Sequence, residues 1–116
     1  FLRVLGLFVL SFGEKVMKEL KEIILNANGP YKGACWGEVC NNIQDVAWEV
    51  LSTKSLRRYT RLTQRDLEQC DGMDGQLFNG QYFDWKEYEY RSRDIVSAFL
   101  DYFTQEDLQK LAKAYQ

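Results

Sequence analysis

The chain has 116 residues, of which 46% are hydrophobic and 28% are charged, which is the composition of one ordinary globular domain. One proline and eight glycines exclude collagen-like and low-complexity classes, and the absence of histidine excludes Ser–His–Asp and Cys–His catalysis and histidine-ligated haem. The net charge of −2 is uneven, with 10 Lys and Arg against 6 Asp and Glu in residues 1–65, and 5 against 11 in residues 66–116. We expect a single domain over residues 1–116.

The first ten residues, FLRVLGLFVL, form the most apolar stretch of the chain. Ten residues are too few to span a bilayer as a helix, so we expect no membrane span. We expect residues 1–10 to dock on the rest of the bundle or on a second copy of the chain.

A first helix is predicted over residues 12–27. Ser11 and Glu14 form a capping box at its start, and Gly29 followed by Pro30 ends it. The apolar positions recur at helical spacing and predict the buried face. They are Phe12, Val16, Leu20, Ile23 and Ile24.

A second helix is predicted over residues 35–51, because apolar side chains recur there every three or four positions over a wide face. Such a helix belongs in the centre of a bundle. Residues 52–55 can cap a short basic helix over residues 56–62.

Two later segments share the pattern apolar–Thr–Gln–x–Asp–Leu, at residues 62–67 and 103–108. In each, the threonine is suited to cap a helix and the acidic residue follows three positions later. We interpret them as two similar helix starts and not as a repeat. A further helix after Ser92 carries Val96, Phe99 and Leu100.

The only β-like signal lies near residues 76–84, where Asn79 and Gly80 stand between apolar and aromatic residues. The sequence therefore predicts a mainly α, single-domain bundle of about five or six helices with one short β-hairpin near residues 76–84.

Three cysteines, Cys35, Cys40 and Cys70, are an odd number, which argues against a fully paired disulfide framework. This favours a reducing, cytoplasmic location, with secretion as the open alternative. The segment DGMDGQL at residues 71–77 is similar to a calcium loop, but it lacks the required ligands at three positions. We therefore expect no metal and no cofactor.

Catalytic patterns are lacking as well. Asp84, Glu87 and Glu89 are close in sequence but are interspersed with basic residues, as on a solvated, charge-balanced face. No phosphate-binding loop or nucleophile elbow is present. We expect that the protein is not an enzyme and has no small-molecule substrate.

The strongest functional signal is a run of six aromatic residues between positions 78 and 90. Tyrosine and tryptophan dominate binding hot spots, because they supply a large contact area at low entropic cost. We expect a protein–protein interaction module, such as an adaptor, an inhibitor or an assembly subunit, that binds a protein partner or a second copy. The expected binding residues are Phe78, Tyr82, Trp85, Tyr88 and Tyr90.

The alternative is a regulatory protein that binds RNA or DNA through the basic residues around position 58. On a continuous helix the arginines would form one stripe that grips phosphates, and the tyrosine among them would stack on a base. The residues concerned are Lys54, Arg57, Arg58, Tyr59, Arg61 and Arg65.

Overall fold

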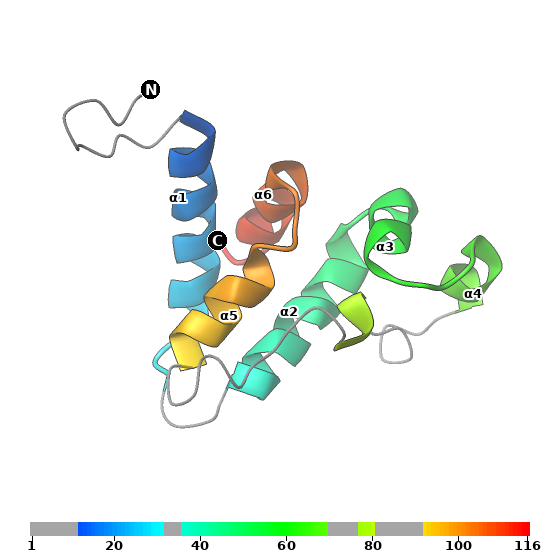
Figure 1. Cartoon of the computed structure of the whole chain (residues 1–116), viewed down its shortest axis with the longest axis horizontal. Coiled ribbons are helices and arrows are strands. Elements are labelled where there is room, and N and C mark those ends of the chain that lie inside the picture. The colour runs from blue at the N-terminus through cyan, green and yellow to red at the C-terminus, as the bar shows by residue number, and fades with distance from the viewer. Residues whose placement is uncertain (1–11, 32–35, 70–76, 81–91) are drawn as a thin grey trace.

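A computed structural model describes residues 12–31, 36–69, 77–80 and 92–116, and within these ranges the chain forms a bundle of six α-helices and one short 3-10 helix (Figure 1). The mainly α prediction is confirmed. In chain order the elements are α1 (Phe12–Ala27), α2 (Trp36–Val50), α3 (Thr53–Tyr59), α4 (Gln64–Gln69), η2 (Leu77–Gly80), α5 (Ser92–Leu100) and α6 (Gln105–Ala114).

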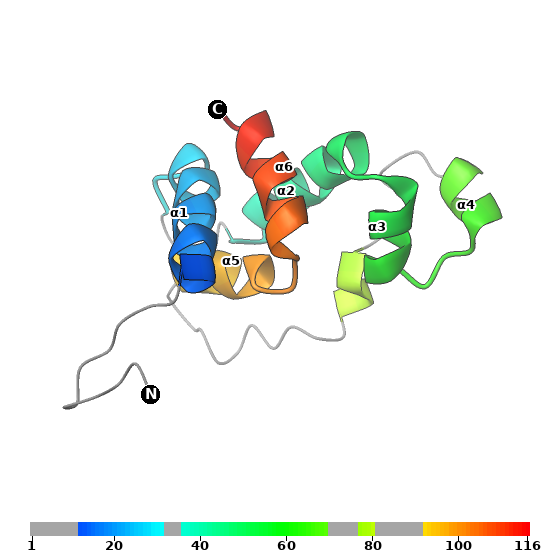
Figure 2. The same ribbon diagram turned by 90° about the horizontal axis from the view of Figure 1, so that it is seen from above.

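The helices divide into a larger and a smaller group. In the larger group α1 packs against α6 and α5, and α2 packs against α5 and α6 from the other side. In the smaller group α3 packs against α4 and η2, at the opposite end of the molecule from α1 (Figures 1 and 2). None of these helices combines the length and hydropathy that crossing a membrane requires, within the described part of the chain.

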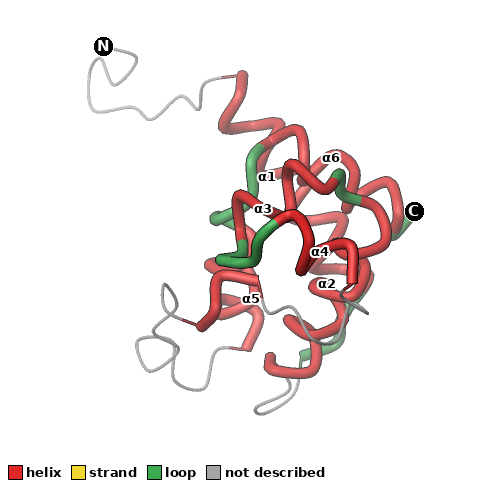
Figure 3. Tube along the Cα trace, turned by 90° about the vertical axis from the view of Figure 1, so that its right-hand side faces the viewer, coloured by secondary structure: helices red, strands yellow, loops and turns green. Residues whose placement is uncertain are grey.

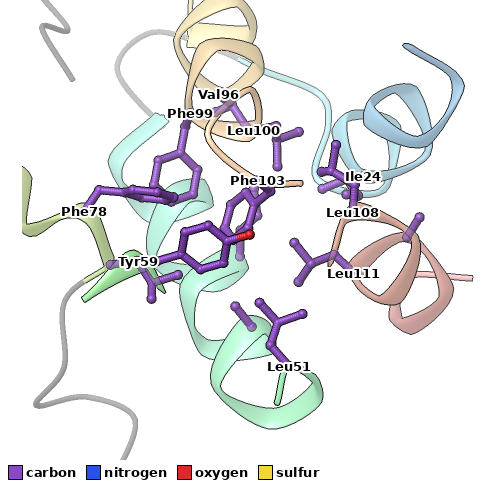
Figure 4. Close-up of a cluster of buried hydrophobic side chains, with 14 of the residues drawn as sticks. Ile24, Leu51, Tyr59, Phe78, Val96, Phe99, Leu100, Phe103, Leu108 and Leu111 are labelled. Atoms are coloured by element: carbon purple, nitrogen blue, oxygen red, sulfur yellow. The ribbon is translucent and has the colours of Figure 1, made fainter. Parts of the chain in front are cut away.

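The hydrophobic core lies between α1, α2, α5 and α6 and continues toward α3 (Figure 4). It forms because the apolar stripes of these amphipathic helices face one another and are removed from water. Completely buried side chains come from four helices. They are Ile24, Ile43, Ala47, Val96, Leu100, Leu108 and Leu111.

The first helix has the predicted bounds, but its buried face is rotated from the predicted one. Ile24 and Leu25 are buried, whereas Phe12 is 83% exposed. The side chain of Lys21 is largely covered and pairs with Asp101 at 2.5 Å. The reason is that α5 and α6 pack on the side of α1 that carries residues 17, 21, 24 and 25.

The predicted helix caps are present where the structure describes them, although the helix that Ser52 caps begins at Thr53 and not at the predicted position 56. Ser52 caps α3, since its side chain accepts a hydrogen bond from the Ser55 amide. Thr104 caps α6 by accepting from the Asp107 amide at 3.2 Å. Thr63 and Asp66 hold the first turn of α4 reciprocally, with the amide of each bonded to the side chain of the other. Ser11 lies outside the described residues.

The predicted hairpin near residues 76–84 is wrong at its first strand, because residues 77–80 form the 3-10 helix η2. Consecutive side chains of a strand point to opposite faces, but Leu77 and Phe78 are both buried. Burying both requires a tight bend, which Phe78 makes with a φ of 59°. Figure 3 shows helices and loops only in the part that the structure describes. Residues 76 and 81–84, like the apolar residues 1–10, lie outside it.

Candidate functional site

Five aromatic side chains meet where η2, α3 and the α5–α6 junction come together, and we call this cluster the aromatic corner. Figure 4 labels Tyr59, Phe78, Phe99 and Phe103 of this cluster. Phe78 is its centre, with ring centroids 4.9–5.6 Å from the four other rings. Most of the pairs are tilted or edge-to-face, the geometry that aromatic rings prefer. The members are Tyr59, Phe78, Phe99, Tyr102 and Phe103.

Only one ring of the aromatic corner is substantially exposed. Phe78 is 6% exposed and belongs to the core, so it differs from the surface anchor that the sequence predicted. Tyr102, which is 38% exposed, covers it from outside with a centroid separation of 4.9 Å. The other predicted anchors, Tyr82, Trp85, Tyr88 and Tyr90, lie outside the described residues.

Sequence reasoning missed Tyr102. It lies just after α5, off the apolar spacing that marks Phe99 and Phe103 as core residues. One signal was available: Tyr102 follows a helix end and does not share the spacing of the buried residues, which indicates an exposed ring. Its packing on Phe78 could not be read from the sequence, because 24 positions separate the two residues.

A buried carboxylate, Asp107 of α6, lies beneath the aromatic corner and is 2% exposed. The Ser55 hydroxyl donates to one carboxylate oxygen at 3.0 Å, and the Tyr59 hydroxyl donates to the other. A guanidinium nitrogen of Arg58 lies 3.8 Å from that second oxygen. These residues form the Asp107 cluster, which joins α3 to α6.

The Tyr59 hydroxyl is a central atom of this cluster. It donates to Asp107 and accepts a hydrogen bond from the Thr104 amide at 3.2 Å. Burial raises the pKa of the Tyr59 phenol, and the hydrogen bond to the Asp107 carboxylate raises it further. The Tyr59 phenol therefore remains protonated and donates to Asp107, and its ring is buried in the core.

The raised phenol pKa predicts a loss of stability at alkaline pH. An unfolded tyrosine ionises around its ordinary pKa of 10.0, whereas folded Tyr59 retains its proton to higher pH. The unfolded state therefore loses protons first, and the free energy of unfolding falls as pH rises above that value. Burial also raises the pKa of Tyr115.

Urea unfolding between about pH 8 and about pH 11 measures this decrease in the free energy of unfolding. Tyr59→Phe should be less stable at neutral pH but show a shallower alkaline decline, and the Tyr115→Phe variant supplies the comparison. An equally steep decline in both single variants and the unmodified chain would show that neither phenol is responsible.

The basic residues do not form the continuous helical stripe that the sequence predicted. Helix α3 ends at Tyr59, and the backbone of its C-cap residue Thr60 is extended, so the helical spacing stops there. Arg61 follows the helix and Arg65 belongs to the separate helix α4. Buried Tyr59 is not available to stack on a base. The remaining cations on α3 are Lys54, Arg57 and Arg58, all exposed.

Little supports catalysis or metal binding in the described part of the chain. It contains no group of three or more acidic or cysteine side chains that could hold a metal ion. Cys40 is partly buried, and burial raises the pKa of its thiol to about 12, which makes it a poor nucleophile. Cys35, Cys70, residues 71–76 and the carboxylates at 84, 87 and 89 lie outside the described residues.

A separate groove of about 610 Å³ runs along α1 where it faces α5 and the start of α6. Its floor includes Met17 and Leu25, and the ion pair between Lys21 and Asp101 crosses it. Charged side chains of both signs line the groove beside apolar ones, so no single charge selects one class of ligand.

Comparison with known proteins assigns no family, since no family model, curated protein or solved structure matches the chain. The features with functional content are therefore local ones. They are the exposed ring of Tyr102 on the aromatic corner and the exposed basic residues of α3.

Proposed function

We propose that this protein is a non-enzymatic protein-interaction module and that Tyr102 is a central anchor of its binding surface. The observation that carries the proposal is the exposed Tyr102 ring packed on the buried aromatic corner, with its ring centroid 4.9 Å from that of Phe78. A tyrosine held in this way loses little entropy when a partner covers it, which is the property of a binding hot spot.

The connection between η2 and α5 supports the same surface. It begins directly after Gly80, two residues beyond Phe78 in the aromatic corner, and leads to Ser92 at the start of α5. Its eleven residues include five aromatic ones. We propose that Tyr82, Trp85, Tyr88 and Tyr90 extend the surface around Tyr102 and contact the same partner.

Nucleic-acid binding is less well supported. The predicted stacking residue, Tyr59, is buried, and Arg58 lies beside the Asp107 carboxylate. A protein partner also fits the low sequence pI of about 5.2, because proteins that bind nucleic acid carry an excess of positive charge.

The experiment is affinity purification of the tagged chain from its source cells, with nuclease, at low and moderate salt. A protein partner should be retained under both conditions, since an aromatic interface responds weakly to salt. Tyr102→Ala and Trp85→Ala should each lower its recovery at least about tenfold, the effect of losing a hot-spot residue. Phe12→Ala, which removes an exposed ring from α1, is the matched control and should retain the partner.

Two results would contradict the proposal. One is retention that neither Tyr102→Ala nor Trp85→Ala changes. The other is recovery of nucleic acid that salt or Arg57→Glu abolishes, which would assign the function to the cationic residues of α3. Circular dichroism of each variant shows whether the fold is preserved.

A further inference from the structure

Two neighbouring helices carry opposite charges on their exposed faces. Helix α2 has three acidic residues and no lysine or arginine, and α3 has three basic residues and no acidic one. We call them the acidic face (Glu38, Asp45 and Glu49) and the cationic face (Lys54, Arg57 and Arg58). All six residues are exposed. The two helices follow one another through Leu51 and Ser52 alone (Figure 2).

Each face brings like charges together. Asp45 and Glu49 are four positions apart, as are Lys54 and Arg58, so each pair lies on adjacent turns of one side of its helix. Like charges at this spacing destabilise a helix. Glu49 also lies in the last turn of α2, where the helix dipole favours a cation and where no basic residue is present.

Nothing in the described part of the chain neutralises most of these charges. Glu38, Asp45, Glu49, Lys54 and Arg57 have no oppositely charged atom within 4 Å there. Arg58 lies 3.8 Å from Asp107, and its side chain remains 50% exposed. Residues that break a local rule without compensation within the fold are expected at functional sites.

We propose that the acidic face of one molecule binds the cationic face of a second copy. Each chain presents both halves of the contact, and their association relieves the like-charge repulsion on both helices at once. The inference does not depend on the proposed aromatic surface, since Tyr102 belongs to neither face. Because a single exposed ion pair contributes little, several pairs must form together, and the association should be strongly sensitive to salt.

Sedimentation velocity of the full chain over a concentration series tests the proposal. The chain should associate at about 0.1 M salt, and the association should be at least about tenfold weaker at about 1 M salt. The reason is that the screening length falls from about 10 Å to about 3 Å between these two salt concentrations. Tyr102→Ala should associate like the unmodified chain, which separates this result from the outcome at the aromatic surface.

Charge reversal identifies the two faces. One variant carries Asp45→Lys and Glu49→Lys, and another carries Lys54→Glu and Arg57→Glu. Each variant alone should self-associate at least about tenfold more weakly than the unmodified chain at about 0.1 M salt. An equimolar mixture of the two should associate again, because the reversed faces are complementary. The control variant exchanges exposed Lys15 and Glu19 of α1 (Lys15→Glu with Glu19→Lys) and should behave like the unmodified chain.

The proposal is overturned if the unmodified chain is monomeric at all concentrations, or if the mixture of the two variants fails to associate while both are folded by circular dichroism. A monomeric chain that binds a single-stranded oligonucleotide, with binding lost when Lys54 and Arg57 are reversed, would assign the cationic face to nucleic acid instead.

Discussion

Replacing Asp107 with alanine is expected to lower the free energy of unfolding by about 3–5 kcal/mol, the range for removing one partner from a buried charged cluster. The loss is large because Asp107 is 2% exposed and accepts hydrogen bonds from Ser55 and Tyr59. Without the carboxylate, both hydroxyls lose a buried acceptor and Arg58 loses its nearby charge. Urea unfolding monitored by circular dichroism measures the change.

The chain provides a matched control for this experiment. Asp66 occupies the same position of the same sequence pattern in α4, but it is exposed and bonds only to Thr63. Asp66→Ala should therefore change the unfolding midpoint far less than Asp107→Ala. A loss in Asp107→Ala no larger than that in Asp66→Ala would show that the buried cluster adds no more stability than an exposed capping bond.

Replacing Phe78 with alanine is expected to lower the free energy of unfolding by about 3–5 kcal/mol, the range for removing a buried phenylalanine. Its ring contacts four other aromatic rings, and its burial also supports the left-handed backbone at φ 59°, which is unfavourable for a residue with a side chain. Alanine retains the unfavourable backbone conformation but loses the ring contacts. Thermal and urea unfolding measure the difference.

Tyr102→Ala is the comparison, since it removes the exposed ring that covers Phe78. Its cost in stability should be smaller, at about 1 kcal/mol, because much of the ring is already in contact with water. If Phe78→Ala were as stable as the unmodified chain and failed to bind the partner, Phe78 would be an interface residue, as the sequence alone suggested.

The sequence predicted the helices well because helix starts and stops are local. Capping by Ser52, Thr63 and Thr104 depends on atoms three residues apart, and a short pattern specifies it completely. Apolar spacing is also local, and Leu108, Leu111 and Ala112, which recur at helical spacing, form the buried face of the last helix. The mainly α bundle followed from these signals.

Features that depend on distant contacts could not be predicted. The same six-residue pattern leaves Asp66 in solvent and buries Asp107, because Asp107 accepts hydrogen bonds from Ser55 and Tyr59 of α3, whereas Asp66 bonds to the nearby Thr63. The Asn-Gly pair at positions 79 and 80 suggested a hairpin, but burial of Leu77 and Phe78 produced a 3-10 helix. Local preference was overridden by tertiary packing at both places.

The candidate site was predicted only in part. An aromatic cluster was expected after position 77, and the structure places Phe78 at its centre, but the ring at the surface is Tyr102. The arginines were expected on one continuous helix, but α3 ends at Tyr59 and the extended residue Thr60 follows it. Whether a given aromatic residue faces the core or the solvent is decided by neighbours remote in sequence.

The packing of α6 against both α1 and α2 has a consequence for biosynthesis. While a ribosome is still adding residues 92–116, the earlier helices lack the surface that covers Ile24 and Ile43. The Asp107 cluster likewise has no acceptor for Ser55 and Tyr59 until α6 has emerged. We therefore expect the nascent chain to stay protease-sensitive until α6 clears the exit tunnel, and then to fold in one cooperative step.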